Sequence, residues 1–147
     1  MIKEFEFFHG LVFARILHAT ERPLLIRRFR PASNASYVLN ETIGLYIKYS
    51  SKRMTPWRFT FLKEHQEEID ALKNSLSTVF LTLVCHDDGI VCLGCPELKA
   101  ILDHQHKPIE WISATRRKNQ MYSVNGSDGK LDFKIGRSDF PAKLFKT

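Results

Sequence analysis

The sequence predicts an α/β fold of the mixed α+β kind, built on a central mixed sheet, and three observations predict it. Residues 43–50 alternate between two sets of side chains at the period of two that is typical of a strand. Residues 2–19 and 62–76 instead carry apolar side chains at the three- and four-residue spacing of a helix. Residues 79–85 are almost entirely apolar, which indicates a strand buried on both faces.

The first third of the chain is predicted to form a helix and a three-stranded antiparallel meander. The helix covers residues 2–19 and ends before Pro23, which cannot donate a backbone hydrogen bond and restricts the residue before it. Tight connections then join short strands at 24–29, 36–39 and 43–50. The last strand is expected to have one buried face and one accessible face, with Lys48 in mid-strand on the accessible face.

The rest of the chain is predicted to complete the fold with further strands and two helices. A strand at 57–61 leads into the helix at 62–76, and strands at 79–85 and 90–93 form a hairpin around Asp87-Asp88-Gly89. A short helix at 96–102, a strand at 110–115 and a hairpin of 121–124 with 131–135 follow. We expect a single domain over 1–147, in which 1–102 form the core and 103–147 form a C-terminal extension.

The charge balance favours an anionic partner. Twenty-two Lys and Arg residues against sixteen Asp and Glu residues give a net charge of +6, and such an excess is typical of proteins that bind nucleic acid or a phosphorylated ligand, although many basic proteins bind neither. The apolar runs are too short to span a membrane, and Glu4 and Glu6 stand where a secretory signal would be basic. Three cysteines, an odd number, argue against a disulfide framework. We therefore expect a cytoplasmic protein with no membrane association.

The order helix, three strands, helix, two strands and helix, with Lys48 on the third strand, resembles the core of the PD-(D/E)XK nuclease-like superfamily, which has the restriction-endonuclease fold. The resemblance covers about residues 2–102. In that superfamily, an upstream acid and an acid-x-Lys tripeptide hold Mg²⁺ beside the scissile phosphate, and the lysine helps to orient the attacking water. Here the tripeptide is Tyr46-Ile47-Lys48. The lysine matches and the acid does not, because tyrosine is not an anionic ligand at neutral pH.

The resemblance implies a set of candidate site residues. Lys48, Glu41 and Glu64 are the candidate catalytic residues, and Glu41 with Glu67 are the candidate Mg²⁺ ligands, since some members of the superfamily move an acid to the following helix. Each has a simpler interpretation: Lys48 as a solvated strand lysine, and Glu41 as a turn residue. The aromatic residues Trp57 and Phe59 are interpreted as core residues, with stacking on bases as the alternative.

The candidate nucleic-acid-binding residues form three basic clusters, which would make one groove if they met in space. They are Arg27, Arg28 and Arg30; Lys48, Lys52, Arg53 and Arg58; and Arg116, Arg117 and Lys118. Charge runs at strand ends are also common as solvated surfaces.

Cys85, His86, Cys92 and Cys95 are the candidate ligands of an alternative zinc site. Cys92 and Cys95 have the spacing of a ligand pair, but Cys85 and His86 are neighbours whose side chains point in opposite directions on a strand. No second pair completes a tetrahedral set. Buried thiols are therefore the favoured interpretation.

Three functional hypotheses follow. The first is a nucleic-acid-binding protein with a nuclease-like fold and an incomplete metal centre, acting as a subunit of a larger restriction or antiviral defence complex. The second is an active Mg²⁺-dependent endo- or exonuclease in which a migrated acid replaces the missing one. The third is a protein–protein interaction module in which the positive charge serves solubility alone.

Overall fold

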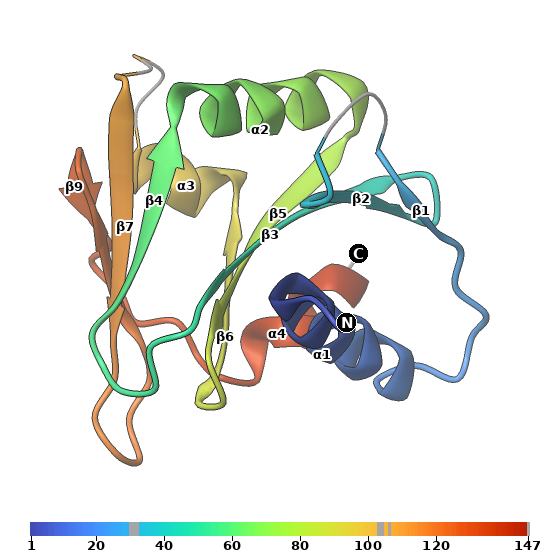
Figure 1. Ribbon diagram of the computed structural model, residues 1–147, viewed down its shortest axis with the longest axis horizontal. Coiled ribbons are helices and arrows are strands. Elements are labelled where there is room, and N and C mark those ends of the chain that lie inside the picture. The colour runs from blue at the N-terminus through green and yellow to red at the C-terminus, as the bar shows by residue number, and fades with distance from the viewer. Residues whose placement is uncertain (30–32, 103–104, 106, 147) are drawn as a thin grey trace.

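The computed structural model describes residues 1–29, 33–102, 105 and 107–146, and it confirms the mixed α+β class. In this part of the chain, the strands form a five-stranded mixed sheet, called sheet A, and a four-stranded antiparallel sheet, called sheet B. The two sheets stand side by side, and helices lie against both faces of sheet A (Figure 1).

Sheet A contains the predicted meander and the predicted buried hairpin. Its strand order is β1-β2-β3-β5-β6, and its strands are β1 (Ile26–Arg28), β2 (Ser36–Leu39), β3 (Ile43–Ser50), β5 (Thr78–Cys85) and β6 (Gly89–Gly94). β3 and β5 are parallel, from the pair Ile43 and Thr78 to the pair Ser50 and Cys85, whereas the other neighbours are antiparallel. β3 is therefore the middle strand of the sheet.

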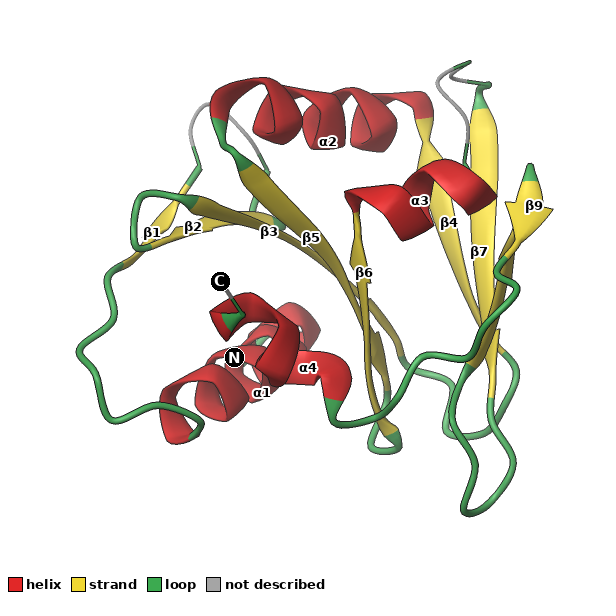
Figure 2. Ribbon diagram, turned by 180° about the vertical axis from the view of Figure 1, so that it is seen from behind, coloured by secondary structure: helices red, strands yellow, loops and turns green. Residues whose placement is uncertain are grey.

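Helices cover the two faces of sheet A differently. α1 (Glu4–His18) lies on one face together with α4 (Asp139–Ala142) and the short 3₁₀ helix η1 (Lys143–Phe145), as Figures 1 and 2 show. α2 (Lys63–Ser75) and α3 (Cys95–Ile101) lie on the opposite face, where α3 fills the space between the two sheets (Figure 2). The C-terminal residues Phe140 and Leu144 are buried against α1 and sheet A.

The sequence predicts one central sheet, whereas the structure has a second, separate sheet B. It has the order β4-β7-β8-β9, with strands β4 (Trp57–Leu62), β7 (Ile109–Thr115), β8 (Ser123–Gly126) and β9 (Gly129–Lys130). The chain leaves sheet A after Ser50, and β4 pairs with β7, about fifty residues later in the sequence. The predicted strand at 131–135 is wrong, because Leu131 and Ile135 turn into the core and only an isolated bridge joins Tyr122 to Ile135.

Two apolar clusters occupy the two sides of sheet A. The larger lies between sheets A and B and contains Tyr46 and Leu83 from sheet A and Trp57, Phe59 and Ile112 from sheet B. The smaller joins α1 and the C-terminal segment to the other face of sheet A. The expected accessible face of β3 is therefore wrong for the first part of the strand. Residues 44–47 are buried, because both faces of the strand are covered there. Among the described residues, no helix is long and apolar enough to cross a membrane.

Candidate functional site

Lys48 does not extend into solvent but reaches from sheet A to the corner between β4 and α2. Its Nζ donates a hydrogen bond to the backbone oxygen of Thr60 at 2.6 Å and lies 3.3 Å from Nδ1 of His65. The same ammonium group stands 4.9 Å from the centre of the Phe61 ring. Lys48 therefore joins β3 to β4 at the point where the two sheets separate.

The surroundings of Lys48 favour its neutral form. Burial lowers the pKa of Lys48 to about 8, and the negative charge of Glu68 opposes part of that effect. Burial and the charge of Lys48 also lower the pKa of His65. His65 Nδ1 accepts a hydrogen bond from the backbone nitrogen of Leu62 at 3.1 Å as well, so we assign the proton of the neutral ring to Nε2.

The carboxylate that acts on the pKa of Lys48 is Glu68, which the sequence did not single out. It accepts hydrogen bonds from the hydroxyl of Ser33 at 2.9 Å and from the hydroxyl of Ser36. Ser36 begins β2 and pairs in register with Tyr46 on β3. Glu68 precedes the buried Ile69 and lies one helical turn after Glu64, a spacing that places it at the margin of the buried stripe of α2.

Among the described contacts, none of the acids predicted to serve Lys48 forms a hydrogen bond with it. Glu41 is in the turn between β2 and β3, where it accepts a 2.7 Å hydrogen bond from Nε of Arg27. Five strand residues, or about 17 Å, separate Ile43 at the start of β3 from Lys48. Glu64 and Glu67 are exposed on α2. Glu64 is near enough to help Glu68 raise the pKa of Tyr46, although burial is the larger cause.

This set of donors does not fit Mg²⁺. The ion requires several oxygen ligands in octahedral geometry, whereas Glu68 is engaged by two serine hydroxyls and Tyr46 is held in its neutral form by burial. Over the ranges that the structure describes, no three His, Cys, Asp or Glu side chains are placed to hold a metal ion, and this includes the cysteine group considered for zinc. Cys85, Cys92 and Cys95 are free, and burial raises the pKa of Cys92 to about 12.

Parts of two predicted basic clusters lie at one end of the molecule. The pairing of β4 with β7 places the loop at 51–56, which contains Lys52 and Arg53, beside the loop at 116–122, which contains Arg117 and Lys118. The backbone nitrogen of Arg116 donates a hydrogen bond to the Thr55 hydroxyl at 3.3 Å. Both loops project from the same end of the sheets in the two views (Figures 1 and 2). We call this region the basic end and define it by Lys52, Arg53, Arg117, Lys118 and Lys134.

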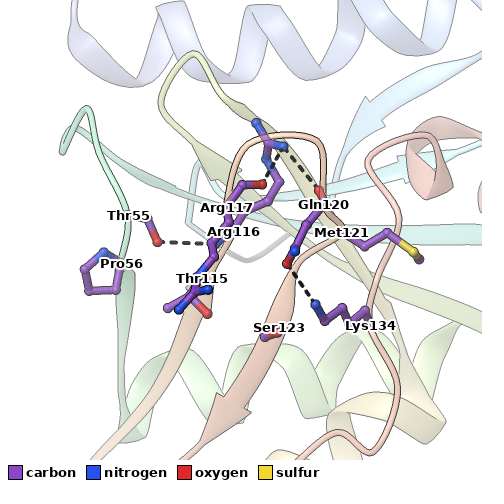
Figure 3. Close-up of a pocket in the computed structure, with 9 residues that line it drawn as sticks. All are labelled: Thr55, Pro56, Thr115, Arg116, Arg117, Gln120, Met121, Ser123 and Lys134. Atoms are coloured by element: carbon purple, nitrogen blue, oxygen red, sulfur yellow. Dashed lines mark hydrogen bonds between the residues drawn. The ribbon is translucent and has the colours of Figure 1, made fainter.

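A cavity of about 580 Å³ opens at the basic end. Figure 3 shows its lining, in which Arg117 and Lys134 supply positive charge and Thr55, Thr115 and Ser123 supply hydroxyl groups. Nζ of Lys134 donates a hydrogen bond to the side-chain oxygen of Gln120 at 3.1 Å. Sequence reasoning missed Lys134 and Gln120, because they come together only through the path of the chain after β9.

Arg116, which borders the same cavity, has a structural role. Its guanidinium donates hydrogen bonds of 2.8 and 2.7 Å to the two carboxylate oxygens of Asp88, in the turn between β5 and β6. The Tyr122 hydroxyl donates to Asp88 at 2.5 Å. Hydrogen bonds from Arg116 are the main reason that the pKa of Asp88 is lowered. Arg116 therefore ties sheet B to sheet A.

The remaining basic residues lie apart from the basic end. Arg58 is on the outer face of sheet B, where its guanidinium stands 4.6 Å from the centre of the Trp111 ring. Arg27 and Arg28 are on β1, the edge strand of sheet A. Arg30 lies outside the described residues. Trp57 and Phe59, considered for base stacking, are each only 2% exposed and belong to the core.

No family model, no curated protein and no solved structure matches this chain.

Proposed function

We propose that this protein binds nucleic acid through the basic end and the adjoining face of sheet B, without cutting it. The observation that carries the proposal is the cavity in which Arg117 and Lys134 lie together, beside the loop that bears Lys52 and Arg53. Several cations at one surface neutralise successive phosphates and release counterions, whatever the base sequence.

The net charge supports this proposal. The chain carries +6, and the cations of the basic end come from three segments that are distant in sequence, at residues 52–53, 117–118 and 134. Basic residues that were merely spread for solubility would not need to gather at one end of the molecule, with Arg117 and Lys134 lining one cavity.

The surroundings of Lys48 support the second half of the proposal. The order of α1, β1, β2 and β3, followed by α2, β5, β6 and α3, is the order on which the nuclease-like resemblance rests, with β4 inserted before α2. The resemblance requires an acid two residues before Lys48, where the chain has Tyr46. It also requires an upstream acid, and the candidate for it, Glu41, is paired with Arg27. We therefore propose a nuclease-like scaffold in which Lys48 is a structural tie and the metal centre is incomplete.

The test is binding of a fluorescent DNA duplex and a fluorescent single strand at two salt concentrations, with Mg²⁺ and then with EDTA. We expect affinity for at least one of them, unchanged by EDTA, with no cleavage products. With four phosphate contacts, affinity should fall about 50-fold to 150-fold between 50 and 200 mM salt. The double variant Arg117→Ala/Lys134→Ala should weaken binding, whereas Arg15→Ala/Lys3→Ala, which removes the same charge from α1 and its N-cap, should not.

Two results would contradict the proposal in different ways. Mg²⁺-dependent cleavage that is lost in Lys48→Ala would show an active nuclease. Absence of binding to both probes at low salt would reject a nucleic-acid role and leave the interaction-module hypothesis.

A further inference from the structure

The outer face of sheet B is open to solvent along its whole length in the described structure. Residues of β4, β7 and β8 alternate strictly, so that Trp57, Phe59, Phe61, Ile112 and Ala114 point into the core. The side chains on the other side of these strands and of β9 are exposed or half-exposed. They are those of Arg58, Thr60, Trp111, Ser113, Thr115, Ser123, Asn125 and Lys130. Figure 1 shows no helix against this side of the sheet.

One row of side chains crosses all four strands of this face. The register pairs Arg58 with Ser113, Ser113 with Asn125, and Asn125 with Lys130. Directly paired residues share a face, so the row has a cation at each end and two small hydrogen-bonding side chains between them. With strands about 4.8 Å apart, the two cations are separated by about 14 Å at the backbone. This row suits an extended chain of anions lying across the strands.

Aromatic side chains accompany the cations of this row. Arg58 covers Trp111 at 4.6 Å from the ring centre, and Trp111 is only half-buried. On the other side of the row, Phe133 is 58% exposed and lines a cavity of about 590 Å³ with Lys130, Lys134 and the acid Asp132. This cavity shares Pro56, Thr115, Ser123 and Lys134 with the cavity of the basic end, so the open face and the basic end are continuous.

From this arrangement we infer that the outer face of sheet B binds single-stranded nucleic acid, with bases stacked on Trp111 and Phe133 and phosphates beside Arg58, Lys130 and Lys134. An exposed aromatic ring gains most from a base whose own face is free, and only an unpaired strand presents such faces. A duplex hides them and offers phosphates alone. A protein partner would gain from the apolar pair Leu62 and Ile109 at the far end of the face, but it would not need the cationic row.

This inference rests on the proposed function, and the experiment separates their failures. The probes are a fluorescein-labelled 12-nucleotide single strand and the duplex of the same sequence, titrated at 50 mM salt. We expect tighter binding of the single strand. Phe133→Ala and Trp111→Ala should each weaken that binding about 5-fold to 150-fold and leave duplex binding almost unchanged.

The chain offers matched controls for both kinds of residue. Phe7, which is 63% exposed on α1, has nearly the exposure of Phe133, so Phe7→Ala controls for the loss of an exposed aromatic ring. Lys130→Ala, which removes one cation from the row, should weaken binding of the single strand. Arg15→Ala, on α1, is its control for the loss of one charge and should not weaken binding. Thermal melts of all variants identify any that fail to fold. If Trp111→Ala is unstable, Phe133→Ala still tests the inference, because the Phe133 side chain is exposed.

A second readout uses intrinsic fluorescence. The chain has two tryptophans, of which Trp57 is buried and Trp111 is not. Single strand should quench the wild-type emission, and Trp111→Phe should lose that quenching while retaining most of the affinity.

Equal affinity for duplex and single strand, with both aromatic variants unaffected, would overturn this inference and leave the proposed function standing. Equal losses in Phe7→Ala and Phe133→Ala would also overturn it. Absence of binding to either probe would reject the proposed function, and this inference with it.

Discussion

Arg116 and Asp88 are joined by hydrogen bonds of 2.7 and 2.8 Å that connect the end of β7 in sheet B to the β5–β6 turn of sheet A. Both side chains are largely buried, with 12% and 19% of their surfaces exposed. Arg116 also donates to the backbone oxygens of Arg117 and Gln120, so the same guanidinium shapes the loop of the basic end.

Removing the charge of Asp88 should destabilise the protein. Asp88→Asn leaves the Arg116 guanidinium with a poorer partner in a partly buried site, and we expect a loss of about 2–4 kcal/mol in the free energy of unfolding. Asp87→Asn is the control, because the neighbouring Asp87 side chain is 74% exposed, and it should leave the free energy of unfolding almost unchanged. Urea unfolding measures both, and equal effects would contradict a specific role for Asp88.

Arg116 should contribute to the stability of the protein, and Arg117 to nucleic-acid binding. Arg116→Ala should reduce stability, whereas Arg117→Ala should leave the urea midpoint unchanged and weaken nucleic-acid binding. A stable Arg116→Ala variant would show that the tie between the sheets is dispensable.

The half-buried Lys48 should make stability rise with pH in the alkaline range. Its pKa is about 8 in the folded protein, against an ordinary value of 10.5, so the unfolded chain binds more protons between these values. The contribution of Lys48 to the free energy of unfolding should increase by about 2 kcal/mol from pH 8 to pH 10.

Lys48→Met isolates this effect, because methionine has a long, unbranched side chain like that of lysine but no group that titrates. The difference between wild type and variant, measured by urea unfolding at each pH, should shift in favour of the wild type as pH rises. A difference that does not change with pH would contradict the assigned burial.

His9 should make the protein sensitive to acid. His9 lies on the buried side of α1, where its Nδ1 is 2.9 Å from the Tyr37 hydroxyl, and burial lowers the pKa of His9 from 6.5 to about 4. Because the unfolded chain takes up a proton first, stability is lost as pH falls through this window, by about 2 kcal/mol between pH 7 and pH 5. His9→Phe should remove this loss of stability between pH 7 and pH 5. His18→Phe, at the exposed end of the same helix, should still show it.

Replacing two glycines by alanine should change the stability of the protein in opposite directions. At Gly126 on β8, an added Cβ would lie 2.4 Å from the backbone oxygen of Ile101, so Gly126→Ala should cost at least about 1–3 kcal/mol. At Gly10, within α1, an added Cβ meets no atom within 4 Å, and Gly10→Ala should stabilise the protein by about 0.5–1 kcal/mol. Thermal melts of both variants test this. If both variants lose stability, the close packing of α3 on β8 is not what makes Gly126→Ala destabilising.

Local pattern was enough to predict most of sheet A. The meander and the buried strand β5 follow from alternation, an apolar run and turn residues within short windows. The separation of sheet B was not predictable in this way, because it depends on pairing between β4 and β7 across about fifty residues. The alternation of Trp57, Phe59 and Phe61 did indicate a strand with one buried face, but it did not indicate which sheet the strand joins.

The candidate site was less predictable than the fold. Lys48 was identified as unusual from its position in mid-strand, yet its partners Thr60 and His65 follow from the corner between β4 and α2. Glu68 and His9 were missed because a polar residue beside an apolar stripe is normally exposed. The roles assigned to Glu41, Glu64 and Glu67 stay predictions that rest on the resemblance, and the structure brings none of these three into hydrogen-bonding contact with Lys48 among the contacts it describes.

The larger apolar cluster is built jointly by both sheets, with Tyr46 and Leu83 packed in the same cluster as Trp57, Phe59 and Ile112. Neither sheet can lose its partner without exposing its own half of that core. Sheets A and B should therefore melt as one cooperative unit, and buried Trp57 is a reporter for both. The fluorescence change of Trp57 in a Trp111→Phe background should coincide with the loss of far-ultraviolet circular dichroism in a single transition.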